Sequence, residues 1–349
     1  MDQIAFLSGE TTLYWYSIIL ALACAAAVCF FWSVYIGKGG SVTAAAVTVP
    51  FAIVLSLVLS RLFHWYSRSD SYSGFVSAMT DYSSGGYGLL GCFGGCLLAA
   101  ALVRLTRLDR NLPKLLDSMS VAAAGGIALG RLACFFSTAD RGPILSSTVE
   151  SLWVYPVRNA VSGIPEYRLA TFVIQAMVTA LIFAVLVVFS LTRERGGNRR
   201  ADGEITLLFL LLYGAAQAVL DSTRYDSLFF RSNGFVSVVQ VFSALAVGFV
   251  TVFYSIRLCR SAGFRAWYLG LWIPIGGLLG CAGYMEYYVQ RHGDNASFSY
   301  TIMSLSLSGV VALALVIRTL AHTLRKSSPR VHKYLSTPDR AHGGQDDGF

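Results

Sequence analysis

Charged residues are scarce in this chain, and their scarcity excludes an ordinary soluble protein. Only 13% of the 349 residues are Asp, Glu, Lys or Arg, whereas 55% are hydrophobic, and the mean hydropathy is +0.59. About a quarter of the residues in a soluble globular domain are charged. The composition therefore predicts an all-α fold, a polytopic bundle of helices embedded in a membrane.

Patterns that would hold a metal or a nucleotide are also missing. Cys92 and Cys96 lie one helical turn apart, but no histidine or further cysteine is nearby, so a metal site is not expected. The seven cysteines lie almost entirely in apolar stretches, where a thiol usually packs as a small apolar group. No glycine-rich phosphate loop follows a strand-like segment, so we expect no soluble cofactor.

Long apolar runs are abundant, and nine of them are long enough to cross a membrane. About 20 helical residues are needed to span about 30 Å of hydrocarbon. The candidate stretches are 14 to 36, 43 to 64, 86 to 103, 117 to 137, 169 to 191, 205 to 221, 234 to 257, 267 to 289 and 299 to 322. The third and sixth are the weakest, because they are short and glycine-rich or polar at their edges.

The positive charges predict how these helices are oriented. No lysine or arginine precedes the first stretch, so a signal-peptide n-region is missing and we expect a retained N-terminus outside the cell. Nine spans then place the C-terminus in the cytoplasm. Eighteen of the 27 lysines and arginines fall on the predicted inner side and seven outside, as the positive-inside rule requires. Orientation thus accounts for the net charge of +8 without a nucleic-acid partner.

The remaining sequence predicts helix contacts, an outer cap and a tail. Three pairs of glycines at i, i+4 allow close helix packing: Gly91 with Gly95, Gly126 with Gly130, and Gly276 with Gly280. Segment 138–168, with three prolines and mixed charges, is expected to form a structured outer cap. The polar tail 327–349 is expected to be disordered.

Two arginines lie inside the apolar stretches, where a charge is costly and usually functional. Arg131 lies six residues below the outer end of the fourth stretch, a depth of roughly 9 Å, and Arg61 lies near the outer end of the second. The sixth stretch ends in YGAAQAVLDSTRYD, which carries several polar side chains on one helical face. These are Tyr213, Gln217, Asp221 and Arg224. All of these residues belong to the predicted outer half of the membrane.

Structural roles compete with functional ones for these charges. Arg61 can extend its head to the outer headgroups, and Asp221 with Arg224 can form an interfacial ion pair. Arg131 lies too deep for the first explanation. A guanidinium is a planar, permanently charged fork that binds phosphate through two hydrogen bonds. In the outer half of a membrane, the abundant phosphate is a phospholipid headgroup, which we expect Arg131 to hold.

Several motifs in this chain resemble those of the bacterial prolipoprotein diacylglyceryl transferases. The stretch GRLACF, from Gly130 to Phe135 and followed by Gly142, is similar to that family's signature, and LLGCFGG (89–95) occupies the place of its His-Gly-Gly helix. LYGAAQAVLDSTRYD (212–226) matches the spacing of its Y-G-x-x-R-x-x-x-E-x-x-R segment, and SVVQ (237–240) resembles its S-x-x-Q. We therefore predict a family core at 1–258, two additional membrane helices at 259–326 and the cytoplasmic tail at 327–349.

The resemblance implies an enzyme of the bacterial plasma membrane. It would transfer the diacylglyceryl group of phosphatidylglycerol to the lipobox cysteine in the signal peptide of a prolipoprotein. Arg131 and Arg224 would grip phosphate, with Asp221 orienting an arginine or accepting a proton. The implied substrate-binding residues are Arg61, Cys134, Asp140, Arg141, Gly142, Tyr213, Gln217 and Gln240.

The chain departs from the family pattern at several positions. The family histidine is replaced by Leu90, one arginine by Gln217, and a tyrosine–glutamate pair by Ile174 and Gln175. His64 at the outer end of the second stretch is an alternative source of a base. A non-catalytic relative that binds lipid or lipoprotein therefore remains a second interpretation. A membrane transporter is the third, because polar groups in a helical bundle also mark transport paths.

Overall fold

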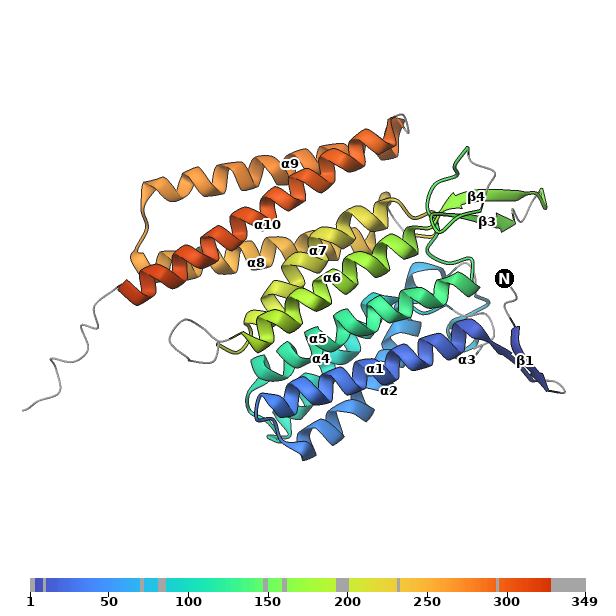
Figure 1. The fold of residues 1–349 in the computed structure, drawn as a ribbon, viewed down its shortest axis with the longest axis horizontal. Coiled ribbons are helices and arrows are strands. Elements are labelled where there is room, and N and C mark those ends of the chain that lie inside the picture. The colour runs from blue at the N-terminus through green and yellow to red at the C-terminus, as the bar shows by residue number, and fades with distance from the viewer. Residues whose placement is uncertain are drawn as a thin grey trace, which may run out of the picture.

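All nine predicted stretches form helices, which pack side by side with their ends at two opposite faces (Figure 1). The computed structural model describes residues 4–8, 11–69, 72–80, 86–146, 150–158, 162–192, 201–230, 233–292 and 295–327. Within these ranges the long helices are α1 (Trp15–Gly37), α2 (Val42–Ser67), α4 (Leu89–Leu105), α5 (Leu112–Arg131), α6 (Thr171–Leu191), α7 (Glu204–Ser222), α8 (Val238–Ala262), α9 (Leu269–His292) and α10 (Ala296–Ser327). Shorter helical elements are α3 (Phe75–Thr80), η2 (Leu132–Phe136) and η3 (Ala266–Tyr268).

Eight helices in the described part of the chain are long and apolar enough to cross a membrane. The exception is α4, an apolar helix of 17 residues, which extends over about 26 Å at 1.5 Å per residue. This is the third predicted stretch, one of the two that the sequence indicates only weakly. The all-α, polytopic fold class is confirmed.

Glycines bring two helix pairs into close contact, as predicted. A side-chain carbon added to Gly91 of α4 would lie 2.3 Å from the Cα atom of Ser60, and one added to Gly95 would lie 2.3 Å from the backbone nitrogen of Ser56, both in α2. On α5, the same carbon at Gly126 would lie 2.8 Å from the Cβ atom of Ala27 in α1. Small residues are therefore required where these helices cross.

The prediction for the third glycine pair is wrong. An added carbon at Gly276 or Gly280 of α9 would meet no described atom within 4 Å. Helix α9 instead packs against α10 through larger side chains, including Ile275 and Ala282. Spacing alone identifies a surface that permits close approach, but it does not determine whether another helix occupies that surface.

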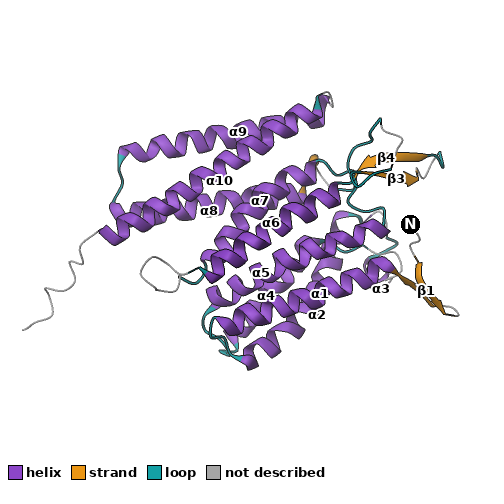
Figure 2. Cartoon of the chain, in the orientation of Figure 1, coloured by secondary structure: helices purple, strands orange, loops and turns teal. Residues whose placement is uncertain are grey.

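The short strands gather at one end of the bundle, where they form three antiparallel pairs among the described residues (Figure 2). The pairs are β1 (Ile4–Ser8) with β2 (Thr11–Tyr14), β3 (Val154–Arg158) with β4 (Pro165–Leu169), and β5 (Phe229–Phe230) with β6 (Asn233–Ser237). In the second pair, Val154 lies opposite Leu169 and Val157 opposite Glu166. The described part of segment 138–168 is thus structured, as predicted. The predicted disordered tail lies outside the described residues from 328 onward.

Buried carboxylates tie helices together at the other end of the bundle. Asp117 of α5 binds Lys38 at 2.7 Å and accepts hydrogen bonds from the backbone N–H groups of Gly203 and Thr206 at the start of α7. Glu204 of α7 pairs with Arg257 of α8 and, at 2.7 Å, with Arg318 of α10. A helix N-terminus and opposite charges both stabilise a carboxylate. These contacts fix the helices that carry the candidate site at their far ends.

Candidate active site

The candidate site lies at the end of the bundle that carries the strands. The polypeptide reaches it at the end of α5, along η2 and the following loop, at the end of α7 and at the start of α8. Asp140 lies in the loop after η2 and is buried. Its backbone φ of 56° is unusual for a residue with a side chain, and such strained conformations concentrate at functional sites.

Backbone hydrogen bonds hold Asp140 in this conformation. Its N–H group donates to Asp226 Oδ2 at 3.0 Å, and its carbonyl accepts from the N–H group of Phe172 at 3.1 Å. Asp226 follows α7, and Phe172 lies in the first turn of α6. Three segments that are distant in the sequence thus determine where the Asp140 carboxylate points.

Two guanidinium groups share the Asp140 carboxylate. Arg131 Nη1 donates to Oδ2, and Arg224 Nη2 lies 2.6 Å from Oδ1. The Sγ atom of Cys134 also donates to Oδ2, at 3.3 Å. Each oxygen of the carboxylate binds one arginine. The carboxylate thereby compensates positive charge that would be very costly to bury alone.

Arg224 is fully engaged by aspartates, whereas Arg131 is not. Besides Asp140, Arg224 binds Asp226 Oδ1 through Nε at 3.0 Å and Asp221 Oδ1 through Nη1 at 3.3 Å. Among the described residues, Arg131 binds a carboxylate only through Nη1, its guanidinium lies near the Tyr213 hydroxyl, and its side chain is 12% exposed. Because a guanidinium carries five N–H donors, Arg131 has more of them left for a ligand than Arg224, whose three nitrogens each bind an aspartate.

The pKa values outside the membrane-spanning segments follow from this arrangement. Burial alone raises the pKa of Asp140, but the charges of Arg131 and Arg224 outweigh it and lower the pKa to about 2. For Arg224, burial lowers the pKa and the carboxylates of Asp140 and Asp226 more than compensate, so its pKa is raised. These groups are therefore all ionised at neutral pH, and Asp140 is a poor proton acceptor.

Asp221 joins α7 to α8. Its Oδ2 atom accepts a hydrogen bond from the hydroxyl of Ser237, and its side chain is fully buried. Ser237 and Gln240 form a reciprocal capping box at the start of α8, which satisfies the first N–H groups of that helix. Gln240 also donates to the Ala218 carbonyl at 3.2 Å. Predicted residue Gln240 is thus a helix cap that lies beside the site.

Arg141 and Gly142 shape the wall of the site. The guanidinium of Arg141 lies 4.4 Å from the ring centre of Phe172 and 4.7 Å from that of Tyr155, and Nη2 donates to the carbonyls of Cys134 and Ser137. Burial lowers the pKa of Arg141. These contacts hold η2 and the loop in place, so Arg141 helps to position the site.

The Gly142 position requires a glycine for packing. A side-chain carbon there would lie 2.5 Å from Thr171 Oγ1 and 2.9 Å from the Cβ atom of Leu169. The N–H group of Gly142 donates to the Leu169 carbonyl at 2.7 Å. The backbone of the loop is thereby held directly against the end of β4 and the start of α6.

Arg61 and His64 of α2 belong to a separate set of contacts. Arg61 is buried, donates to the carbonyls of Ala78 and Gly86, and lies 5.2 Å from the ring centre of Tyr72. His64 Nδ1 lies 2.9 Å from the Tyr72 hydroxyl. Arg61 therefore binds carbonyls and aromatic rings on the segment after α2.

Tyr213 and Gln217 lie along the predicted face of α7 and are both buried. The Tyr213 ring stacks on Phe209 at 5.2 Å, and its hydroxyl has no hydrogen-bond partner among the described residues. At a family position on α6, Gln175 is buried and its amide is likewise unpartnered in the described part of the chain. Leu90 on α4 is partly buried.

Three contributors to the site are absent from the predicted site residues. Asp226 binds both Arg224 and the backbone of Asp140, Ser237 binds Asp221, and the Ser227 hydroxyl donates to the Asp221 carbonyl at 2.7 Å. Asp226 is the last residue of the YGAAQAVLDSTRYD stretch. Its position two residues after Arg224 could therefore have identified it as a site residue from the sequence. Ser227 carried no such signal.

The fold and site thus define a polytopic membrane protein with clustered arginines and aspartates at one end of its helices. A family model described as prolipoprotein diacylglyceryl transferase matches residues 3–256. Two relatives, from Streptococcus pneumoniae strains Hungary19A-6 and JJA, are each 30% identical over 214 residues, which cover 59% of this chain and 76% of theirs. Both are named phosphatidylglycerol–prolipoprotein diacylglyceryl transferase. The chain belongs to the prolipoprotein diacylglyceryl transferase family.

Proposed function

We propose that this chain transfers the diacylglyceryl group of phosphatidylglycerol to the cysteine thiol of a prolipoprotein signal peptide. The family membership and the names of its relatives support this activity. In the reaction, the thiol gives up its proton, a bond forms between its sulfur and the glyceryl carbon, and the bond from that carbon to the phosphate oxygen breaks. Glycerol phosphate leaves, and the proton passes to it or to solvent. Negative charge grows on the leaving phosphate, so fixed cations in a site poor in water would stabilise the transition state.

The observation that carries the proposal is the asymmetry between the two arginines that share Asp140. Arg224 is bound by three carboxylates, so we assign it a positioning role. Arg131 retains unused donors and some exposure, so we assign it the phosphate of the lipid. Asp140 and Asp221 are occupied by arginine and serine partners and orient these groups.

Five of the remaining predicted site residues surround these groups. Cys134, Arg141 and Gly142 shape the loop that carries Asp140, and Tyr213 and Gln217 line the α7 face toward the same end. We further propose that the site faces the outer half of a bacterial plasma membrane, with the N-terminus outside and the C-terminus in the cytoplasm. The excess of lysines and arginines in the opposite loops supports this orientation.

The division of the chain also remains a proposal. We propose a family core at 1–258, two additional helices at 259–326 and a cytoplasmic tail at 327–349. The end of the family match at residue 256 supports the first boundary.

One set of substitutions favours a second candidate function, a relative that binds lipid without transferring it. Leu90 replaces the family histidine, and Gln217 replaces a family arginine. Loss of a base and of a cation would slow both thiol activation and departure of the phosphate. Binding through Arg131 would persist.

A direct assay separates the two functions. The purified protein is incubated with phosphatidylglycerol and a peptide that carries a lipobox cysteine, and the thioether product is measured by mass spectrometry. We expect product from the unmodified chain and a loss of about 100-fold or more in Arg131→Gln, the usual effect of removing a charge-stabilising donor. Arg291→Gln, which alters an exposed arginine in the last turn of α9, is the matched control and should remain active. Lipid binding without product at any pH would establish the second function, as would failure to restore growth to cells depleted of their own transferase.

A further inference from the structure

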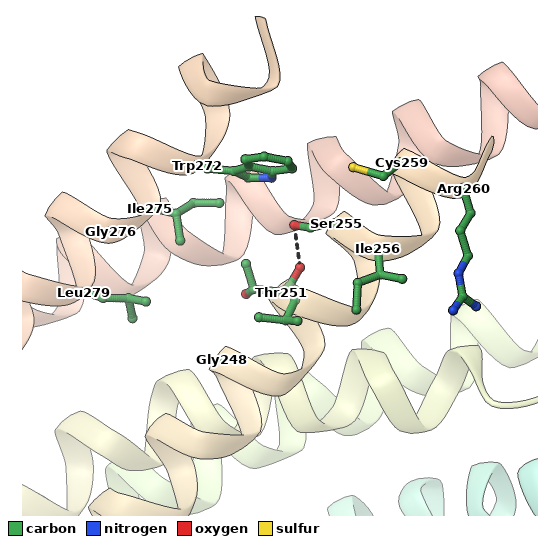
Figure 3. A pocket seen from close by; sticks show the side chains of 11 residues that line it. Gly248, Thr251, Ser255, Ile256, Cys259, Arg260, Trp272, Ile275, Gly276 and Leu279 are labelled. Carbon is green, nitrogen blue, oxygen red and sulfur yellow. Dashed lines mark hydrogen bonds between the residues drawn. The ribbon is translucent and has the colours of Figure 1, made fainter. Parts of the chain in front are cut away.

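A groove of about 590 Å³ separates α8 from α9 (Figure 3). Both helices pack against α10 and barely touch each other, which leaves the space between them open. The volume lies within the range of about 300–1,000 Å³ that is typical of small-molecule sites. The wall formed by α9 lies beyond residue 256, where the family match ends.

The walls of the groove are apolar even where their residues carry hydroxyls. Thr251 donates to the Val247 carbonyl and Ser255 to the Thr251 carbonyl, both at 2.8 Å, so each hydroxyl is satisfied within α8. At Gly248 and Gly276 on the facing walls, an added side-chain carbon would meet no described atom within 4 Å. The groove therefore presents hydrocarbon and bare backbone to its occupant.

The groove opens toward the lipid and has a cation at one end. Its lining residues Val252 and Ile256 are 57% and 47% exposed, and on a membrane-spanning helix such side chains face hydrocarbon. Arg260 lines the end of the groove (Figure 3) and has no ion pair with a described residue. Its neighbour Arg257, by contrast, pairs with Glu204.

We propose that this groove binds one anionic phospholipid, with an acyl chain between α8 and α9 and the phosphate at Arg260. An apolar channel that ends in a guanidinium without an ion pair to any described residue matches the two parts of such a lipid. Ser237, beside the candidate active site, is 23 residues from Arg260, or about 35 Å along the helix. The groove is therefore separate from the reacting centre.

Charge argues against a helix as the occupant. A membrane helix oriented like α8, from a second copy or a signal peptide, carries its own cations at the same end. Such a helix would place like charges beside Arg260, where their repulsion is weakly screened. An anionic headgroup has the opposite sign.

Native mass spectrometry of the full-length protein tests the proposal. The protein is exchanged into mixed micelles that contain either phosphatidylserine, which is anionic but lacks the glycerol headgroup of the proposed donor, or zwitterionic phosphatidylcholine. We expect retention of phosphatidylserine over phosphatidylcholine, a loss of about fivefold in affinity in Arg260→Gln, and loss of the bound lipid in Gly276→Leu, which fills the groove.

Two matched variants control for charge and bulk. Arg265→Gln removes an exposed charge outside the groove, and Gly270→Leu adds the same side chain on α9 where there is also open space. Both should retain lipid like the unmodified chain, and transfer activity should be unchanged in Arg260→Gln, so this test does not depend on the proposed reaction. Equal retention of the two lipids, equal effects of Arg260→Gln and Arg265→Gln, or full retention in Gly276→Leu would each overturn the proposal.

Discussion

Removing the carboxylate that two arginines share should destabilise the fold strongly. The substitution Asp140→Asn preserves the size of the side chain but deletes its charge. An amide oxygen can still accept from one guanidinium, whereas the ionised carboxylate accepts from Arg131 at one oxygen and from Arg224 at the other. Arg131 and Arg224 would then lie close together and nearly buried, without the negative charge of Asp140 between them.

The magnitude follows from the pKa of Asp140. That pKa lies near 2 instead of the ordinary 3.8, and because each pKa unit corresponds to about 1.4 kcal/mol, ionisation in the folded state contributes about 2.5 kcal/mol. Removing one partner of a buried ion pair typically costs about 3–5 kcal/mol. We expect Asp140→Asn to lower the free energy of unfolding by about 2–4 kcal/mol and the Tm in detergent by roughly 5 °C or more.

The pH dependence of the Tm tests the same interaction between Asp140 and the two arginines. A carboxylate whose folded pKa is depressed stabilises the protein fully above its unfolded pKa, and this contribution disappears as the pH falls through the folded value. The Tm difference between the unmodified chain and Asp140→Asn should therefore be constant above about pH 5 and shrink between pH 4 and 2.

A neighbouring aspartate provides the control. Asp226 also binds Arg224, but its side chain is 21% exposed, and the amide oxygen in Asp226→Asn can still accept the backbone N–H group of Asp140, so the loss should be smaller than in Asp140→Asn, about 1 kcal/mol. Equal Tm values for Asp140→Asn and the unmodified chain at pH 7 would refute the assignment of Asp140 as the shared counter-ion.

Three further substitutions test other contacts. Gly142→Ala should lower both Tm and transfer activity, because its new methyl group would collide with Thr171 Oγ1; activity at the unmodified level would contradict the close approach. Glu204→Gln should lower the free energy of unfolding by about 2–4 kcal/mol, since Arg257 and Arg318 lose their buried partner, while KM for the peptide should not change. Cys134→Ser should retain at least half of the transfer activity, because its thiol makes only a 3.3 Å hydrogen bond to the shared carboxylate and the reacting thiol belongs to the substrate; a tenfold loss would show that Cys134 takes part.

Helices were predictable from the sequence because crossing a membrane imposes a length and an apolar composition on each one. The nine stretches differ from the observed helices mainly at their ends, and one of the two stretches with the weakest signal is the shortest long helix, α4. The glycine contacts of α4 with α2 were also predictable. The open space beside Gly276 and Gly280 was not predictable, because the position of α9 depends on how its other faces pack against α10.

The members of the candidate site were predictable in part, and their partners were not. Arg131 stands out because charge inside a membrane is rare, and Arg224 stands out because it lies on the polar face that ends the sixth stretch. Their roles differ because Asp221 and Asp226 flank Arg224 along one turn of chain, while Asp140 is the one acidic partner of Arg131 in the described part of the chain. That difference depends on a loop conformation, including the positive φ of Asp140, which no spacing rule supplies.

The shared carboxylate also changes the physical explanation for a charge at Arg131. The sequence suggested that a phospholipid would be its counter-ion, but the protein already provides one in Asp140. An arginine held by a fixed carboxylate is oriented before the substrate arrives, and preorganised charge costs no rearrangement when negative charge develops on the leaving phosphate. Because Asp140 occupies only Nη1 among the described residues, the same guanidinium can be anchored through one nitrogen and present the others to a phosphate. Anchoring and substrate binding are therefore compatible at this residue.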